Sequence, residues 1–118
     1  MGYLHYGSTA HGIEIEDRSL AHLRVAILSL LRAGHTVAFT YQRAHELGGR
    51  ESVWITPTTD LRFRFLGSRT PKLNEAWVRA LIESNHSAAG LHLVRECPPS
   101  NQPLPHQPPQ APVRQLRR

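Results

Sequence analysis

Cationic side chains gather in one short segment of the sequence. The stretch LRFRFLGSRTPK at 61–72 carries four of them: Arg62, Arg64, Arg69 and Lys72. Guanidinium and ammonium groups bind the phosphates of nucleic acid, and the free amides at the start of a helix also favour anions. These residue types in this order therefore indicate a phosphate-binding ledge for DNA or RNA.

An ordinary strand accounts for the same segment. Side chains alternate along a strand, so Arg62 and Arg64 point to one side while Phe63 and Phe65 point to the other. Single-strand binding sheets stack bases on exposed aromatic rings, whereas these phenyl rings point away from the arginines, so we expect them in the core. The cations then form either the ledge or a solvated face paired with acids such as Glu51.

Eight histidines invite comparison with metal sites. No two of them have the i, i+4 helical spacing of a zinc site, and Cys97 is the only cysteine. His5 and His92 would lie close together if the first and last strands pair, and His22 could then face them. The sequence predicts no metal site; a pocket that joins these histidines to a carboxylate would be needed to favour an enzyme.

The acidic residues show no catalytic pattern either. Glu14 and Glu16 lie two apart on an expected strand, so they share one side, where we expect water rather than a cleft. Asp17 has the position of a helix cap and Asp60 that of a turn residue. We therefore predict no catalytic residue and no cofactor.

The positive charge is concentrated at the end of the chain. The whole sequence has 14 Lys and Arg against 9 Asp and Glu, a net charge of +5. Residues 1–96 hold eleven of these cations and all nine acids, a net +2, and residues 97–118 add three arginines and no acid. The body of the chain is thus much less basic than the total suggests, which weakens charge as evidence for nucleic acid.

The expected strands come in two groups. Six segments have the alternation or the β-branched and aromatic content of strands: 2–7, 12–16, 35–42, 52–56, 61–66 and 90–95. The three segments between 35 and 66 follow one another closely and predict an antiparallel meander. We expect Trp54, within the meander, to lie in the core.

Two segments have the apolar spacing of helices. The first begins with Asp17 or Ser19 as its cap and ends at Gly34. The second has Thr70 as its cap and Pro71 in its first turn. Its expected buried face consists of Leu73, Trp77, Val78, Leu81 and Ile82.

The element order is ββαβββαβ, which predicts an α+β fold. We expect an antiparallel sheet of about six strands with both helices on one face. The chain has room for one domain, which we place at residues 1–96. Residues 97–118 hold seven of the nine prolines and little that could fill a core, so we expect a disordered basic tail.

Several phrases resemble a known family: GYLHYG, DRSLAHLRV, VWITPTTDLRFRFLGSRTPKLNEAW and GLHLV. They are similar to small actinobacterial domains without an assigned activity, some of which carry the label ATP-dependent DNA ligase. The similarity covers nearly all of residues 1–96, and the stretch from W-x-x-P to LNxAW is its most distinctive part. It implies a small α+β domain and brings no catalytic residues.

The ligase label can be tested against the chemistry of adenylyl transfer. That reaction requires a nucleophilic lysine, which ligases carry in a Lys-x-Asp-Gly motif, and carboxylates that hold a metal ion. The sole lysine here lies in the sequence Lys72-Leu73-Asn74-Glu75, which has neither the Asp nor the Gly. A ligase-associated accessory domain would fit the label better than a catalyst.

The sequence thus predicts a small non-enzymatic binding module. Nucleic acid is the first candidate partner, through the four cations of 61–72. The alternative is a protein-interaction or structural domain that uses a sheet edge or the proline-rich tail, with no role for nucleic acid. The N-terminal residues have no apolar signal-peptide region and no run is long enough to span a membrane, so we expect a cytoplasmic protein.

Overall fold

The structure is a computed structural model that describes residues 1–8, 12–43 and 48–99. Within these residues the chain forms five strands and two helices, which confirms the α+β class. In chain order they are β1 (Gly2–Tyr6), β2 (Gly12–Ile15), α1 (Asp17–Arg32), β3 (Val37–Gln42), β4 (Arg50–Ile55), β5 (Leu61–Arg64) and α2 (Glu75–Ser84). The segment expected to be a disordered tail lies outside the described residues from position 100 onward.

The strands form two antiparallel sheets instead of one sheet of six. Sheet A has the order β2-β1-β5, and sheet B consists of β3 and β4. The predicted meander is wrong after β4, because β5 pairs with β1, with Phe63 beside Leu4. A hydrogen bond from the Gly7 amide to the Asp60 carbonyl (2.8 Å) closes this pair at its end. Pairing with β1 lets Phe63 join the core that surrounds Leu4.

The expected last strand is also absent from the described residues. Only Leu91 pairs with a strand, through one parallel bridge to Phe39 on β3. Its amide donates to the Ala38 carbonyl and its carbonyl accepts from the Thr40 amide, each at 2.9 Å. The chain then turns away from β3, since the carbonyl of Val94 accepts a bond from the Trp77 indole of α2 (2.9 Å).

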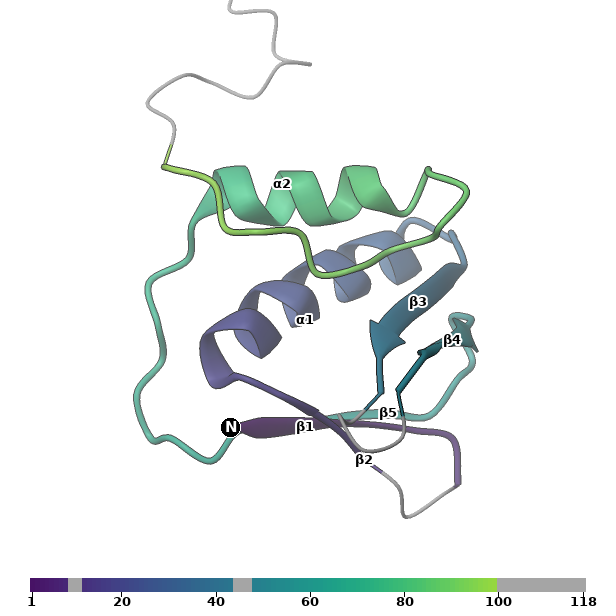
Figure 1. Ribbon diagram of the computed structural model, residues 1–118, viewed down its shortest axis with the longest axis horizontal. Coiled ribbons are helices and arrows are strands. Elements are labelled where there is room, and N and C mark those ends of the chain that lie inside the picture. Colours follow the sequence, from purple (N-terminus) through teal and green to yellow (C-terminus); the bar gives the residue numbers. More distant parts are fainter. Residues whose placement is uncertain (9–11, 44–47, 100–118) are drawn as a thin grey trace, which may run out of the picture.

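The helices form two layers over the sheets (Figure 1). α1 packs against β1 and β3, and α2 packs against α1. Figure 1 shows α2 beyond α1, on the side away from β1. The expectation that both helices cover one sheet face is therefore wrong for α2. Among the described residues neither helix combines the length and the apolar character that crossing a bilayer requires.

Both helix starts differ from the sequence-based expectation. α1 begins at Asp17 after the N-cap Glu16, whose side chain makes no capping bond. Asp17 does not cap because its carboxylate accepts the amide of Gly67 (2.8 Å) instead. α2 begins after Asn74, whose side-chain oxygen accepts the amide of Trp77 (3.4 Å). Thr70 is therefore four residues too early to be the cap.

The core lies between the two sheets and α1. Its fully buried members include Leu4, Leu23, Ile27, Phe39 and Ile55. A second, smaller cluster between the helices contains Ala26, Trp77 and Leu81. Three expected core residues are exposed. Trp54 on β4 is 64% exposed, because the alternation of this strand buries Val53 and Ile55, while Leu73 before α2 is 42% and Phe65 after β5 is 36% exposed.

Candidate nucleic-acid interface

The outer face of sheet A is built by the register of its three strands. Arg64 lies opposite Tyr3, and Arg62 lies opposite His5. Leu4, between these two residues of β1, is fully buried toward α1, so Tyr3 and His5 must point to the other side of the sheet. Two aromatic rings and two arginines therefore share one face, which we call the outer face of sheet A.

The aromatic rings on this face come from β1. Tyr3 and His5 are half-buried, and their ring centroids lie 6.1 Å apart. Gly12 of β2 lies opposite His5, and a Cβ at this glycine would come within 2.7 Å of the imidazole. The absence of a side chain at Gly12 thus makes room for the imidazole over β2.

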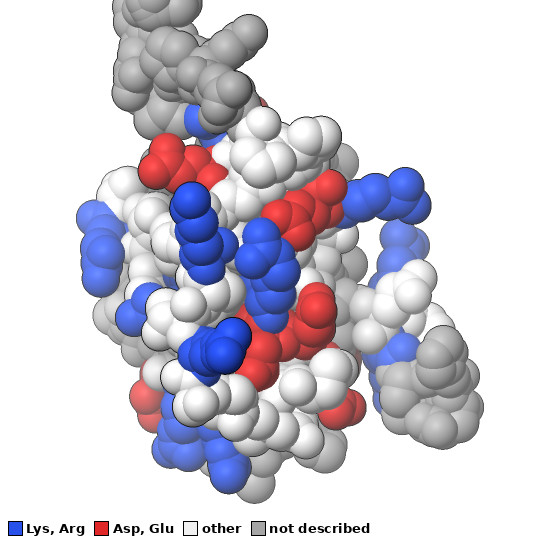
Figure 2. All heavy atoms as spheres, turned by 90° about the vertical axis from the view of Figure 1, so that its left-hand side faces the viewer, with Lys and Arg blue, Asp and Glu red and all other residues white. Residues whose placement is uncertain are grey.

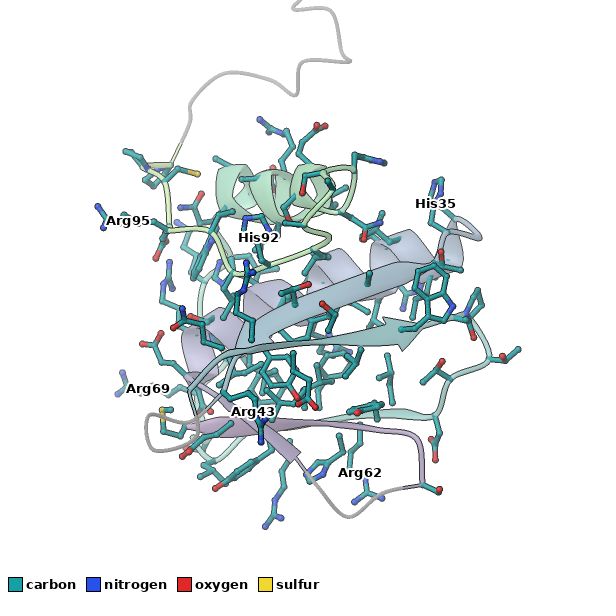
Figure 3. The ribbon with its side chains drawn as sticks, turned by 45° about the vertical axis from the view of Figure 1, so that its right-hand side comes forward. His35, Arg43, Arg62, Arg69, His92 and Arg95 are labelled. Carbon is teal, nitrogen blue, oxygen red and sulfur yellow. The ribbon has the colours of Figure 1, made fainter. Side chains whose placement is uncertain are left out.

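The arginines on the outer face are exposed. Neither Arg62 nor Arg64 takes part in an ion pair or side-chain hydrogen bond with any described residue. Figure 3 shows Arg62 extending away from the helices. The expected pairing with Glu51 does not occur; the Glu51 carboxylate instead accepts the hydroxyl of Tyr41.

The phenyl rings of the cationic segment have different environments. Phe63 is half-buried and packs against the core, as expected. Phe65 is 36% exposed, so its expected place in the core is wrong. β5 ends at Arg64, opposite Tyr3, and the bond between Gly67 and Asp17 then draws the chain toward the start of α1. Phe65 consequently lies beyond the paired part of the strand.

The other two cations lie beyond β5. Figure 3 shows Arg69 at the left edge of the molecule, well apart from Arg62 at its lower side. Arg69 lines a hollow of about 290 Å³ between α1 and the connection from β5 to α2, together with Arg24 and Phe65. Lys72 follows in this connection with an exposed side chain. The four cations therefore form a track from the outer face into the connection, and not one compact cluster.

Acids interrupt the positive charge along the connection. Figure 2 views the molecule from the side of this connection and shows cationic and acidic side chains interspersed over the face. On the outer face itself, Glu14 of β2 lies opposite Tyr3 and two strands from Arg64. Charge alone would give weak attraction for nucleic acid, so the aromatic rings have to contribute to any binding.

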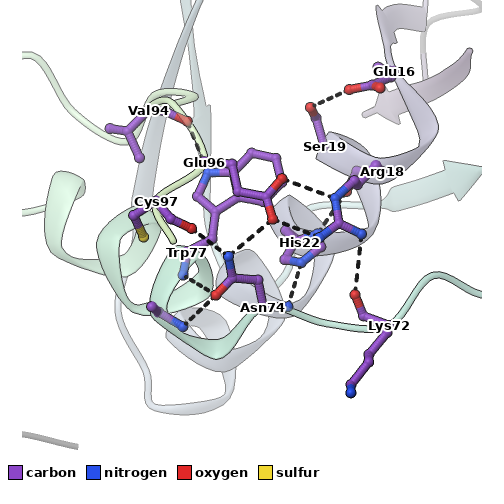
Figure 4. Close-up of polar contacts among 11 residues, drawn as sticks. Glu16, Arg18, Ser19, His22, Lys72, Asn74, Trp77, Val94, Glu96 and Cys97 are labelled. Carbon is purple, nitrogen blue, oxygen red and sulfur yellow. Dashed lines mark hydrogen bonds and ion pairs between the residues drawn. The ribbon is translucent and has the colours of Figure 1, made fainter. Parts of the chain in front are cut away.

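A polar network fixes the connection from β5 to α2 (Figure 4). The guanidinium of Arg18 donates to the Lys72 carbonyl (3.3 Å) and pairs with Glu96 (2.6 Å). The fully buried imidazole of His22 accepts the amide of Asn74 (2.8 Å) through Nε2. Helix α1 thus holds both ends of the segment from Lys72 to Asn74.

The same network holds the end of the described chain. The Asn74 side-chain amide donates to the Cys97 carbonyl (2.6 Å) and to Glu96 (3.0 Å). The hydrogen bond from Arg18, then the one from Asn74, lowers the pKa of Glu96 to about 2. In return, the hydrogen bond to Glu96 raises the pKa of Arg18. Residues up to Cys97 are therefore joined to the helices.

The histidines considered for a metal site do not come together. His5 lies on the outer face of sheet A, whereas His22 is buried between the helices beside Trp77, with ring centroids 4.5 Å apart. His92 bonds through Nδ1 to the Gly90 carbonyl (2.9 Å). Nowhere in the described ranges do three His, Cys, Asp or Glu side chains gather as metal ligands would.

Sequence reasoning found the arginines of the outer face but missed its aromatic rings. Phe63 and Phe65 were the rings nearest in sequence, whereas Tyr3 and His5 belong to a strand more than fifty residues away. The signal was the alternation in GYLHY, which places Tyr3 and His5 on the side opposite Leu4. It becomes informative only once β1 is known to pair with β5.

Comparison with known proteins identifies a family. Residues 1–96 match the family described as Domain of unknown function (DUF7882), and the chain belongs to it. No curated protein and no solved structure matches the chain. The family match covers the strands, both helices and the network up to Glu96.

Proposed function

We propose that the protein is a non-enzymatic module that binds single-stranded nucleic acid on the outer face of sheet A. Arg62 and Arg64 contact phosphates, and Tyr3 and His5 stack against bases. The observation that carries the proposal is the presence of two aromatic rings and two exposed arginines, which pair with no described acid, on one face of adjacent strands. Single-strand binding sheets combine these same two kinds of contact.

Arg69 and Lys72 extend this surface along the connection to α2. A strand of nucleic acid that leaves the outer face past Arg64 would meet Arg69 next, at the hollow that Arg24 and Phe65 also line. The four cations then act in succession along the bound strand. Such a module fits an accessory role beside a DNA ligase or another enzyme of nucleic acids, and we expect it to act in the cytoplasm.

The test is a salt-dependent binding titration with the full chain. Fluorescence anisotropy of a labelled twelve-nucleotide single strand is measured at several salt concentrations. Binding to single strands falls with salt by a log-log slope of about 0.7 per phosphate contacted. Because Arg62 and Arg64 each contact one phosphate, the variant Arg62→Ser with Arg64→Ser should reduce the slope by about 1.4.

Two controls locate the binding surface. The variant Arg32→Ser with Arg43→Ser removes the same charge from exposed positions outside the interface, so it should leave the slope nearly unchanged. Replacing the tail arginines at 114, 117 and 118 by Ser tests whether the tail binds instead. If the tail variant loses the binding and the Arg62 and Arg64 variant keeps it, the proposed surface is wrong.

A separate variant tests whether Tyr3 stacks against a base. Tyr3→Ser should weaken binding about 5-fold to 100-fold, as expected for the loss of one stacked base. The slope against salt should stay the same, because no phosphate contact is lost. If Tyr3→Ser binds as tightly as the unaltered chain, electrostatic attraction alone would account for the binding. The assignment of a module that binds single strands by stacking would then be wrong.

A protein-interaction domain is the second candidate. Trp54 lies on β4, an outer strand of sheet B, and is 64% exposed. Exposed tryptophans are enriched where proteins bind one another. Absence of nucleic-acid binding at low salt, together with a dimer in light scattering that Trp54→Ser dissociates, would favour this candidate.

A further inference from the structure

A groove lies between the edges of the two sheets. It has a volume of about 660 Å³ and is bordered by four consecutive residues on each side: Ile13 to Ile15 of β2 with the following Glu16, and Phe39 to Gln42 along β3. Consecutive residues point to alternate faces of a strand, so the groove runs along the strand edges and not over one face. Glu14 and Glu16, expected to face open water, are exposed but border this groove.

Both strand edges have backbone groups that lack a strand partner. β2 is the outer strand of sheet A, and no described segment pairs with its free edge. On the groove side, Leu91 is the one described residue that pairs with β3, and it occupies the Ala38 carbonyl and the Thr40 amide, so the open part of this edge lies beyond the Thr40 amide. Open edges of this kind are templates for an added strand. The groove therefore separates two edges that one further strand could join.

We propose that this groove binds an extended peptide strand from a partner protein, in which apolar residues alternate with cationic ones. The added strand would lie between β2 and β3 and join the two sheets into one. This site lies at the edge of sheet A and shares Glu14 with the outer face, but it does not depend on the binding of nucleic acid.

The alternation follows from the residues along the groove. Ile13, Ile15 and Phe39 are buried and offer apolar neighbours on the core side. Glu14 and Glu16 alternate with the two isoleucines and offer carboxylates on the solvent side. Opposite charges on neighbouring strands stabilise pairing. A bound strand should thus place its apolar side chains beside Ile13 and Ile15 and its cations beside the two glutamates.

Two basic side chains also border the groove. They are Arg50 and His92, and both come from sequence outside β2. The acidic character is thus confined to the β2 side, so the cationic residues of the peptide should lie next to β2. Four residues on each edge correspond to a strand of about 13 Å. A hexapeptide is therefore long enough to test the site.

The experiment uses the full chain and synthetic peptides with blocked ends. The peptide Val-Lys-Val-Lys-Val-Lys is titrated by isothermal calorimetry and compared with Val-Val-Val-Lys-Lys-Lys, which has the same composition and charge. Alternation predicts at least tenfold tighter binding of the first peptide. Methylation of every second amide nitrogen in the first peptide should abolish binding, because these amides donate to the strand edge.

Variants of the chain test whether the peptide binds in the groove. Glu14→Gln with Glu16→Gln should weaken binding about tenfold. Glu75→Gln with Glu83→Gln removes the same charge from exposed positions on α2 and should have no effect. Equal loss in both double variants, or equal binding of the methylated and unmethylated peptides, would overturn the proposal, because only nonspecific charge attraction would remain.

Two other segments could occupy the groove, and each would give a different result in these experiments. If residues 111–118 of this chain occupy the groove, removing them should tighten peptide binding, and a peptide of that sequence should compete with the hexapeptide. If a second copy occupies it, light scattering should show a dimer that the hexapeptide dissociates. Either result would overturn the assignment to a partner protein.

Discussion

The buried histidine of α1 joins that helix to the connection that leads to α2. His22 is fully buried, and its Nδ1 donates to the Arg18 carbonyl (2.8 Å) while its Nε2 accepts the Asn74 amide (2.8 Å). Its ring also lies against Trp77, with a centroid separation of 4.5 Å. His22→Ala would remove all of these contacts at once.

The expected loss can be worked out from the contacts. A buried amide left without its acceptor, here that of Asn74, costs about 1–3 kcal/mol. The cavity beside Trp77 adds a further loss, since large-to-small core substitutions typically cost about 2–5 kcal/mol. The two losses overlap where neighbours relax, so we expect His22→Ala to lower the free energy of unfolding by about 3–5 kcal/mol.

Urea unfolding monitored by tryptophan fluorescence measures this loss. The matched control is His86→Ala, because His86 is exposed and its ring lies edge-on to that of His35, with centroids 6.5 Å apart. This control should stay within about 0.5 kcal/mol of the unaltered chain. Hydrogen exchange adds a local readout: the Asn74 amide should exchange faster in His22→Ala. A loss below about 1 kcal/mol, or one equal to that of the control, would refute the role given to His22.

Two further changes test other parts of the fold. Glu96 has a pKa of about 2 instead of 4.5 because Arg18 binds its carboxylate, so its stabilising effect is complete above pH 4.5 and is lost as the pH falls toward 2. Glu96→Gln should therefore be less stable than the unaltered chain at pH 7, and urea unfolding should show this difference shrinking between pH 4.5 and 2; a constant difference would contradict the ion-pair explanation. Gly90→Ala should be markedly destabilising, because φ is +79° and the new Cβ would lie 2.4 Å from the Ala38 carbonyl oxygen. Gly34→Ala is the matched control for thermal unfolding, since φ is +85° there but no atom lies within 4 Å of the Cβ, and equal losses at both sites would show that the contact with β3 is unimportant.

Local patterns in the sequence predicted most of the elements. The apolar spacing from Leu20 to Leu31 located α1, and the alternation around Ile13, Phe39 and Val53 located three of the strands. In each case the residues that define the pattern are those that fill the core. These elements could be found because a helix or strand that buries one side has apolar residues at the spacing of that side.

The pairing of the strands could not be predicted in the same way. Short turns favoured a meander that continued from β4 to β5, but β5 crosses to β1. The alternation within a strand indicates which of its sides is buried, but not which other strand it pairs with. The helix start at Asn74 was missed for a similar reason, because the bonds of Asn74 to His22 and Cys97 link it to distant parts of the chain.

The candidate interface was predictable only in part. Arg62 and Arg64 were correctly expected to be exposed, since the alternation of β5 is local. The contribution of Tyr3 and His5 depends on the pairing of β1 with β5, so no local pattern could bring these rings and the arginines together. The position of Arg69 depends on the connection that Asp17 holds through Gly67, which is again a long-range contact.

Nuclear magnetic resonance mapping tests the proposed function most directly. Backbone amide shifts of the full chain are recorded while a short single-stranded oligonucleotide is added. The proposal predicts that the largest changes occur at residues 2–6 and 61–64, with smaller ones at 65–72. Changes confined to α2, to sheet B or to residues beyond 99, or no change at all at low salt, would contradict the account.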